Sequence, residues 1–239
     1  MSSRKEQKEA LRQERLEREQ QAAQSAARKR LIGIVVAAVL VLGIVGALAA
    51  VLLAGDGGGG GGDGGGGGAR VEYPDGGEIP EQQEADLKVA AEAAGCKDEV
   101  IEAEGAGSHT SDPDEEIEYD SEPPSIGRHY EQWPDDDLYE EAPRTSHVVH
   151  TLEHGRILVW IRPDLPEEQR AQFKALYDED PYHVIMLPRE ELKEPFAVTA
   201  WVGQSTGHTL RCKAINDQTW DAIRSFKEKY RDKAPEFVP

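Results

Sequence analysis

Apolar side chains recur at two different spacings along residues 86–239. Residues 156–162 carry a β-branched side chain at every second position, as in a β-strand that buries one face. Residues 216–230 carry large apolar side chains three residues apart, as on the buried face of a helix. These patterns predict strands at 148–152, 156–162, 183–187, 196–202 and 208–212, and helices at 86–95, 166–178 and 216–230. The order of the elements predicts an α+β domain, a mixed sheet with helices packed on it.

A continuous apolar run precedes this domain. Residues 31–54 carry no charged side chain, and at about 1.5 Å per residue they exceed the roughly 30 Å of bilayer hydrocarbon. A cleavable signal peptide is the alternative, because Ala47-Leu48-Ala49 resembles a cleavage site. However, the run is longer than a usual signal-peptide core, and a leader with five glutamates is unusual. We therefore expect an uncleaved transmembrane helix in the lipid bilayer.

The charges beside this helix predict its orientation. Residues 1–30 hold nine Lys/Arg and five Glu, and Arg28, Lys29 and Arg30 adjoin the apolar run. Positive residues remain in the cytoplasm, where these three would attract anionic lipid head groups. We expect a single-pass protein of the plasma membrane with a cytoplasmic N-terminus and an extracytoplasmic C-terminal domain.

Glycine and acidic residues dominate the sequence that follows. Residues 55–68 are twelve glycines and two aspartates, so 55–85 is expected to be a flexible linker to a domain at 86–239. Residues 69–239 hold 18 Lys/Arg and 39 Asp/Glu, and thirteen of these acids lie in 112–141, expected to be an irregular arm. A surface this acidic repels phosphate backbones, so nucleic-acid binding is not expected.

The chain has two cysteines, Cys96 and Cys212. The expected topology places both outside the cytoplasm, where an even pair is typical of a disulfide bond. Two free buried thiols are the alternative.

The segment HVVHTLEHGR, residues 147–156, concentrates three histidines and one glutamate. Its core fits the zinc-peptidase pattern H-x-x-E-H, in which a helix brings both histidines to one metal and the glutamate acts on a bound water. Here the neighbouring residues are mainly β-branched and favour a strand. In a strand, His150 and His154 would lie about 13 Å apart. A peptidase site is therefore not expected.

A metal site without catalysis is the sharper hypothesis. His129 follows a turn of proline and glycine, and His150 and His154 flank an expected bend. Imidazoles brought together from separate loops suit Zn²⁺ or Cu²⁺, and Glu153 would be a further ligand or would orient them. The predicted metal ligands are His129, His150, His154 and Glu153, with His109 and His147 as further candidates.

The alternative is a metal-free interaction or scaffold module of the cell envelope. The histidines would then hydrogen-bond loop carbonyls, and Glu153 would pair with Arg156 or Arg128. No Gly-x-Ser-x-Gly motif accompanies the histidines, and no catalytic residue is predicted.

Several motifs occur in a fixed order along the second half of the chain. They are Pro123-Pro124-Ser125-Ile126-Gly127-Arg128-His129, then Val149-His150-Thr151-Leu152-Glu153-His154-Gly155, Ala200-Trp201, Cys212 and Ala234-Pro235-Glu236. Together they resemble the bacterial domain of unknown function 3105, over about residues 85–239. One departure is Ile126, where that family tends to have a small residue. The resemblance implies a membrane-anchored extracytoplasmic domain, typical of actinobacteria and their relatives, and implies no particular activity.

Overall fold

The computed structural model describes residues 70–236 and 238. The predicted cytoplasmic segment 1–30, the predicted transmembrane helix 31–54 and the glycine run lie outside the described residues. Within the part of the chain that is described, no helix is both long enough and apolar enough to cross a membrane.

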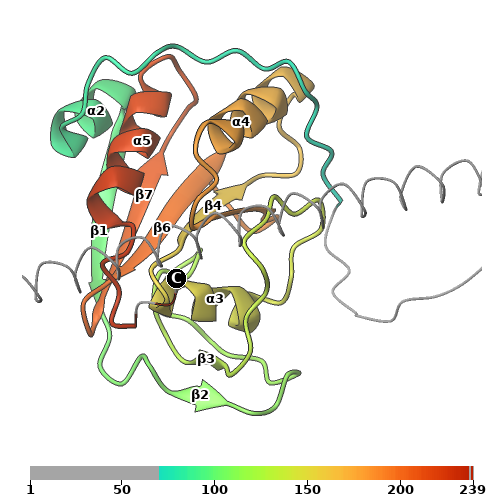
Figure 1. Cartoon of the computed structure of the whole chain (residues 1–239), viewed down its shortest axis with the longest axis vertical. Coiled ribbons are helices and arrows are strands. Elements are labelled where there is room, and N and C mark those ends of the chain that lie inside the picture. The colour runs from blue at the N-terminus through green and yellow to red at the C-terminus, as the bar shows by residue number, and fades with distance from the viewer. Residues whose placement is uncertain (1–69, 237, 239) are drawn as a thin grey trace, which may run out of the picture. The chain divides into compact units, whose positions relative to one another are not determined.

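A five-stranded mixed sheet lies at the centre of the domain (Figure 1). Its strands are β1 (Cys96–Glu102), β4 (Ile157–Ile161), β5 (Val184–Pro188), β6 (Phe196–Val202) and β7 (Thr206–Cys212). The order across the sheet is β1-β7-β6-β4-β5, with β4 and β5 parallel and the other neighbours antiparallel. The predicted mixed sheet is confirmed, and β1 is a strand that the hydrophobic pattern did not indicate.

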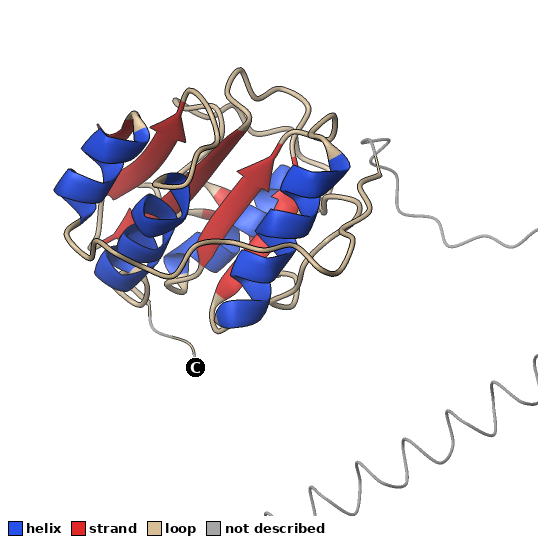
Figure 2. Cartoon of the chain, turned by 90° about the horizontal axis from the view of Figure 1, so that it is seen from above, coloured by secondary structure: helices blue, strands red, loops and turns tan. Residues whose placement is uncertain are grey.

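Helices pack on both faces of this sheet (Figure 2). They are α2 (Leu87–Ala94), α3 (Thr145–Glu153), α4 (Glu167–Glu179) and α5 (Thr219–Tyr230). Alternate residues of β4 belong to two different cores, as the period of two requires. Ile157 and Val159 belong to the core that contains apolar residues of α2, α4 and α5, whereas Leu158 and Trp160 pack in the core with α3.

The strand predicted at 148–152 is wrong, because these residues belong to α3. Val148 and Leu152 lie one helical turn apart, and both are fully buried in the core between α3 and the sheet. The hydroxyl of Thr151 donates a hydrogen bond of 2.6 Å to the Val148 carbonyl, which accommodates a β-branched side chain within the helix. Burial on several sides therefore outweighs the weak helix propensity of the segment.

The end of α3 depends on Gly155. This residue has φ +83°, and a Cβ there would lie 2.8 Å from the Cα of Asp232. Its carbonyl accepts the backbone N–H of Asp232 at 3.0 Å. The C-terminal segment therefore packs directly against the end of α3.

Residues 70–85, which the sequence assigned to the linker, lie against the domain. The side chain of Val71 is 1% exposed, and its backbone N–H donates to the carbonyl of Glu140. The backbone N–H groups of Gln83 and Glu84 both donate to the carboxylate of Asp221 on α5. Packing therefore begins at least as early as Val71.

The predicted disulfide joins Cys96 to Cys212, which are paired across β1 and β7. The sulfurs are bonded over a separation of 116 residues. The bond ties the first strand of the sheet to its neighbour at the end nearest α2.

Candidate metal centre

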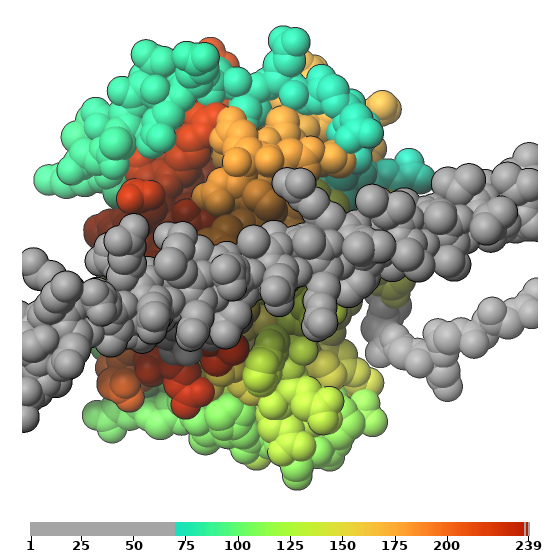
Figure 3. Space-filling model, in the orientation of Figure 1, coloured from blue at the N-terminus to red at the C-terminus, as the bar shows by residue number. Residues whose placement is uncertain are grey.

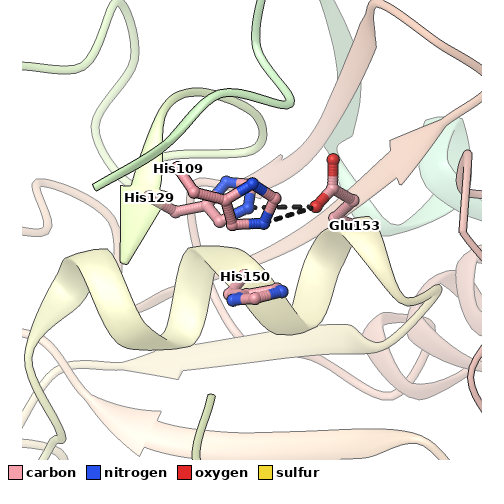
Figure 4. Close-up of side chains that lie close together, drawn as sticks. All are labelled: His109, His129, His150 and Glu153. Atoms are coloured by element: carbon pink, nitrogen blue, oxygen red, sulfur yellow. Dashed lines mark hydrogen bonds and ion pairs between the residues drawn. The ribbon is translucent and has the colours of Figure 1, made fainter. Parts of the chain in front are cut away.

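Four side chains converge where two short strands meet α3 (Figure 4). The strands are β2 (His109–Thr110) and β3 (His129–Tyr130). They pair in parallel, so that His109 lies directly opposite His129. His150 and Glu153 are three residues apart on α3 and therefore share one face of the helix. The four residues each offer one ligand atom, and these atoms all lie within 4.8 Å of one another.

His129 is held by the Pro-Pro turn that precedes it. The ring is fully buried, and its Nδ1 lies 2.8 Å from the carbonyl oxygen of Gly127. Gly127 has φ +148°, and a Cβ there would lie 2.8 Å from the ring of Tyr119. Only glycine therefore leaves room for the backbone that orients the imidazole.

The same turn is packed on the sheet through Gly207 of β7. A Cβ at Gly207 would lie 2.3 Å from the hydroxyl oxygen of Ser125 and 2.8 Å from a methyl carbon of Ile126. Ile126 is 4% exposed and belongs to the core between α3 and the sheet. The isoleucine at position 126 is thus accommodated because Gly207, on the strand against which it packs, has no side chain.

His150 is fixed in a similar way by β3. Its Nδ1 lies 2.6 Å from the carbonyl oxygen of Tyr130. Burial and then the neighbouring His129 lower the pKa of His150 to about 4. The ring is therefore neutral at pH 7, with its proton on Nδ1 and a lone pair on Nε2.

Glu153 is the anionic member of the group and is 3% exposed. Its Oε2 lies 3.0 Å from Nε2 of His129 and 3.3 Å from Nε2 of His109. Burial alone would raise the pKa of the Glu153 carboxyl. The hydrogen bond with His129, and then the electrostatic effect of that ring and its neighbours, outweigh burial, so that this pKa is lowered. The group therefore contains a carboxylate at neutral pH.

The hydrogen bond of His129 with Gly127 limits what the other ring nitrogen can offer to the carboxylate. A carbonyl oxygen can only accept, so Nδ1 of His129 carries a proton and a neutral ring has its lone pair at Nε2. That lone pair would face Oε2 of Glu153 at 3.0 Å, which is repulsive unless a proton or a cation lies between them. Imidazoles that donate Nδ1–H to a carbonyl and present Nε2 inward are typical of metal ligands.

His154 lies outside this group. Both of its ring nitrogens are buried and have no hydrogen-bond partner among the described residues. Its ring packs against Trp133 at 4.5 Å and against His150 at 4.7 Å between centroids. Burial lowers the pKa of His154, so the ring is neutral at pH 7. The nearest carboxylate oxygen is 4.0 Å from Nδ1 and belongs to Glu236.

Three of the four predicted ligands are thus close together, and His109 joins them in place of His154. His147, the other candidate, stacks on Tyr130 one turn before His150 and is not in the group. The helix that the H-x-x-E-H pattern requires is present, yet the ligand atoms that converge are those of the first histidine and the glutamate.

The arginines predicted as alternative partners of Glu153 pair elsewhere. Arg156 binds Asp136 at 3.0 Å, and Arg128 binds Glu115. Both acidic partners belong to the segment between β1 and α3. In the space-filling view this segment, green to yellow-green, forms the lower end of the domain (Figure 3).

Comparison with known proteins gives one match. The family model described as "Protein of unknown function (DUF3105)" matches residues 110–238, more than half of the chain. The matched region includes His129, His150 and Glu153 and begins one residue after His109. No curated protein and no solved structure gives a significant match.

Proposed function

The chain belongs to the DUF3105 family, and we propose that it binds a single Zn²⁺ or Cu²⁺ ion through a His₃Glu site in a membrane-anchored extracytoplasmic domain. The ligands are His109, His129, His150 and Glu153. One observation carries the proposal: two buried imidazoles have Nδ1 held by backbone carbonyls, and both belong to a group whose ligand atoms, including a buried carboxylate oxygen, lie within 4.8 Å of one another.

Two distances within the group match a metal of this size, and the whole set of ligand atoms lies within 4.8 Å. In a tetrahedral zinc site with bonds of about 2.0 Å, neighbouring ligand atoms lie about 3.3 Å apart. The distances from Oε2 of Glu153 to the Nε2 atoms of His129 and His109 are 3.0 and 3.3 Å. Imidazole ligands suit zinc and copper, whereas Ca²⁺ and Mg²⁺ require mostly oxygen ligands.

The metal-free alternative explains less of the geometry. In that alternative Glu153 would pair with His129 and His109, at 3.0 and 3.3 Å, because the two candidate arginines have carboxylate partners between β1 and α3. Three imidazoles around one carboxylate would then be a purely structural cluster, although two of them have the orientation of ligands.

Metal content tests the proposal directly. The full chain, purified in detergent and loaded with Zn²⁺ or Cu²⁺, is expected to retain a single ion after desalting. His150→Ala is expected to reduce the retained metal below about a tenth of an ion, since a buried ligand is lost. The measurement is elemental analysis of metal per chain.

His147→Ala is the matched control, because His147 lies one turn earlier on the same helix and outside the ligand group. This variant should retain the metal of the parent chain. Substoichiometric metal in the parent, or equal retention in both variants, would refute the site.

The location outside the cytoplasm has independent support. The Cys96–Cys212 disulfide favours an oxidising compartment for the domain. The uncharged run at 31–54 and the basic residues before it favour an anchor with a cytoplasmic N-terminus.

This topology predicts the result of two fractionation experiments. The full chain should stay in the membrane pellet after alkaline extraction, and a protease added to cells with an intact plasma membrane should reach its C-terminal domain. Replacing residues 31–54 by a polar linker is the control that should release the protein. Protection of the domain from protease until the membrane is opened would contradict the proposed orientation.

A further inference from the structure

His154 is a buried titratable side chain that lies outside the proposed metal centre. It is 3% exposed, and both of its ring nitrogens are buried without a hydrogen-bond partner among the described residues. A neutral imidazole has one donor and one acceptor, and leaving them unsatisfied in the interior destabilises a folded protein. A bound ligand at this ring would relieve that cost.

The carboxylate of Glu236 lies next to the ring. Its Oε2 is 4.0 Å from Nδ1 of His154, and 59% of its side chain is exposed. The backbone of Glu236 also adjoins the ring, yet no hydrogen bond to it satisfies either nitrogen. An ion pair would require a protonated ring, which burial disfavours because it lowers the pKa of His154. A proton therefore does not join the two groups at pH 7.

The C-terminal segment that carries Glu236 is fixed to the end of α3. The backbone N–H of Glu236 donates to the carbonyl of Glu153 at 3.1 Å. The guanidinium of Arg156 donates to the carbonyls of His154 and Val238, at 3.1 and 2.5 Å. The imidazole and the carboxylate are therefore held side by side by contacts of the backbone.

The gap between the two side chains fits one metal ion. Zinc bonds to imidazole nitrogen and carboxylate oxygen at about 2.0–2.2 Å, so two ligand atoms of one ion lie at most about 4.2 Å apart. The 4.0 Å between Nδ1 of His154 and Oε2 of Glu236 is within this limit. Because Glu236 is largely exposed, rotation of its side chain can bring the oxygen closer, and water can supply the remaining ligands.

The surface around Glu236 attracts cations. Glu236 lines a cleft of about 680 Å³ together with Glu104 and Glu153, and the described part of this lining contains no lysine or arginine. Arg156, whose charge would oppose a metal ion here, is paired with Asp136 at 3.0 Å. An acidic concave surface raises the local concentration of cations. Cations can therefore reach the exposed carboxylate from solvent.

We propose that His154 and Glu236 form a second binding position for a Zn²⁺ or Cu²⁺ ion, with water completing its coordination. Its ligands are distinct from those of the His₃Glu centre. Imidazole nitrogen favours these ions, whereas Ca²⁺ and Mg²⁺ require mostly oxygen ligands. With two protein ligands instead of four, the second position binds its ion more weakly than the centre and exchanges it with solvent.

Equilibrium dialysis of the full chain in detergent against Zn²⁺, with bound metal measured by elemental analysis, tests this second position. The parent chain is expected to bind an exchangeable ion in addition to the ion that it retains after desalting. His154→Phe keeps a flat ring and removes both nitrogens, so it should weaken the exchangeable binding by at least about tenfold. Glu236→Gln should do the same, because it keeps the shape of the side chain and removes its charge.

Glu104→Gln is the matched control, because Glu104 is an exposed carboxylate of the same cleft. This variant should keep the exchangeable ion. The metal-free His154→Phe chain should melt at or above the temperature of the parent, since phenylalanine has no polar atoms to leave unsatisfied. Glu236→Gln changes an exposed side chain and gives the answer should His154→Phe fail to fold.

The outcomes separate this position from the His₃Glu centre. No exchangeable ion in the parent, unchanged binding in a folded His154→Phe or Glu236→Gln chain, or an equal loss in Glu104→Gln refutes the second position and leaves the centre standing. A parent chain that retains no ion after desalting, yet loses exchangeable Zn²⁺ on both substitutions, refutes the centre and supports the second position.

Discussion

Replacing His129 by alanine is expected to lower the metal affinity of the chain by at least about 100-fold. The loss of a group that merely orients a ligand costs about 10–100-fold, and the loss of a ligand should cost at least as much. His129 is fully buried and fixed by the Gly127 carbonyl, so the ring cannot be replaced by a neighbouring side chain without moving the Pro-Pro turn. Competition with a chromophoric chelator would measure the change.

His109→Ala is the comparison that makes this expectation specific. The His109 side chain is 38% exposed, so water can enter the position that the ring leaves. Its loss should cost only about tenfold in affinity, and added imidazole should restore part of that loss. Equal losses in the two variants would contradict the assignment of His129 as the fixed ligand and His109 as the exchangeable one.

A folding control is needed because His129 is buried. Glu153→Gln keeps the shape of the side chain and removes its charge, so it should lower metal affinity without leaving a cavity. The melting temperatures of the metal-free variants, followed by circular dichroism, would show whether a loss of affinity is a loss of structure. An unchanged affinity in a folded Glu153→Gln chain would remove Glu153 from the ligand set.

Reduction of the Cys96–Cys212 bond is expected to lower the free energy of unfolding by up to about 4–5 kcal/mol. The bond closes a loop over 116 residues, and the chain-entropy model assigns such loops the largest effect on the unfolded state. The measurement is denaturant unfolding with and without reductant.

The Cys96→Ala/Cys212→Ala double variant is the control for side effects of the reductant. It should unfold at the same denaturant concentration as the reduced parent. Its metal content should stay unchanged while it is folded, because the bond lies at the opposite end of β1 from the loop that leads into β2. Equal stability of the oxidised and reduced chains would contradict the loop argument.

The sheet could be predicted because its pattern is local. Each buried strand carries its own alternation or apolar run, and β6 has the bounds that the sequence indicated. The helix α3 could not be predicted from propensity, because Val148, Val149 and Thr151 favour strands. The spacing of Val148 and Leu152 was the available signal, together with Gly155 at the end.

In the candidate site, too, the local sequence predicts some of the contacts and not others. His150 and Glu153 are close because they share a helix, and the histidines and glutamate concentrated in residues 147–156 indicate a metal site from the sequence. His109 and His129 are close because β2 pairs with β3, and neither two-residue strand has a hydrophobic pattern. His154 follows His150 by four residues and its ring packs against that of His150, yet it also packs on Trp133 and lies outside the ligand group, which helix geometry alone does not predict.

The parallel pairing of β2 with β3 has a consequence for the acidic segment between them. A chain that leaves His109 and enters His129 in the same direction must travel around and return, so residues 111–128 form a loop with both ends at the ligand group. An ion bound by His109 and His129 would hold the two ends of that loop together. It would reduce the number of arrangements open to a segment whose many carboxylates repel one another. Metal content and the order of this acidic loop would therefore rise and fall together.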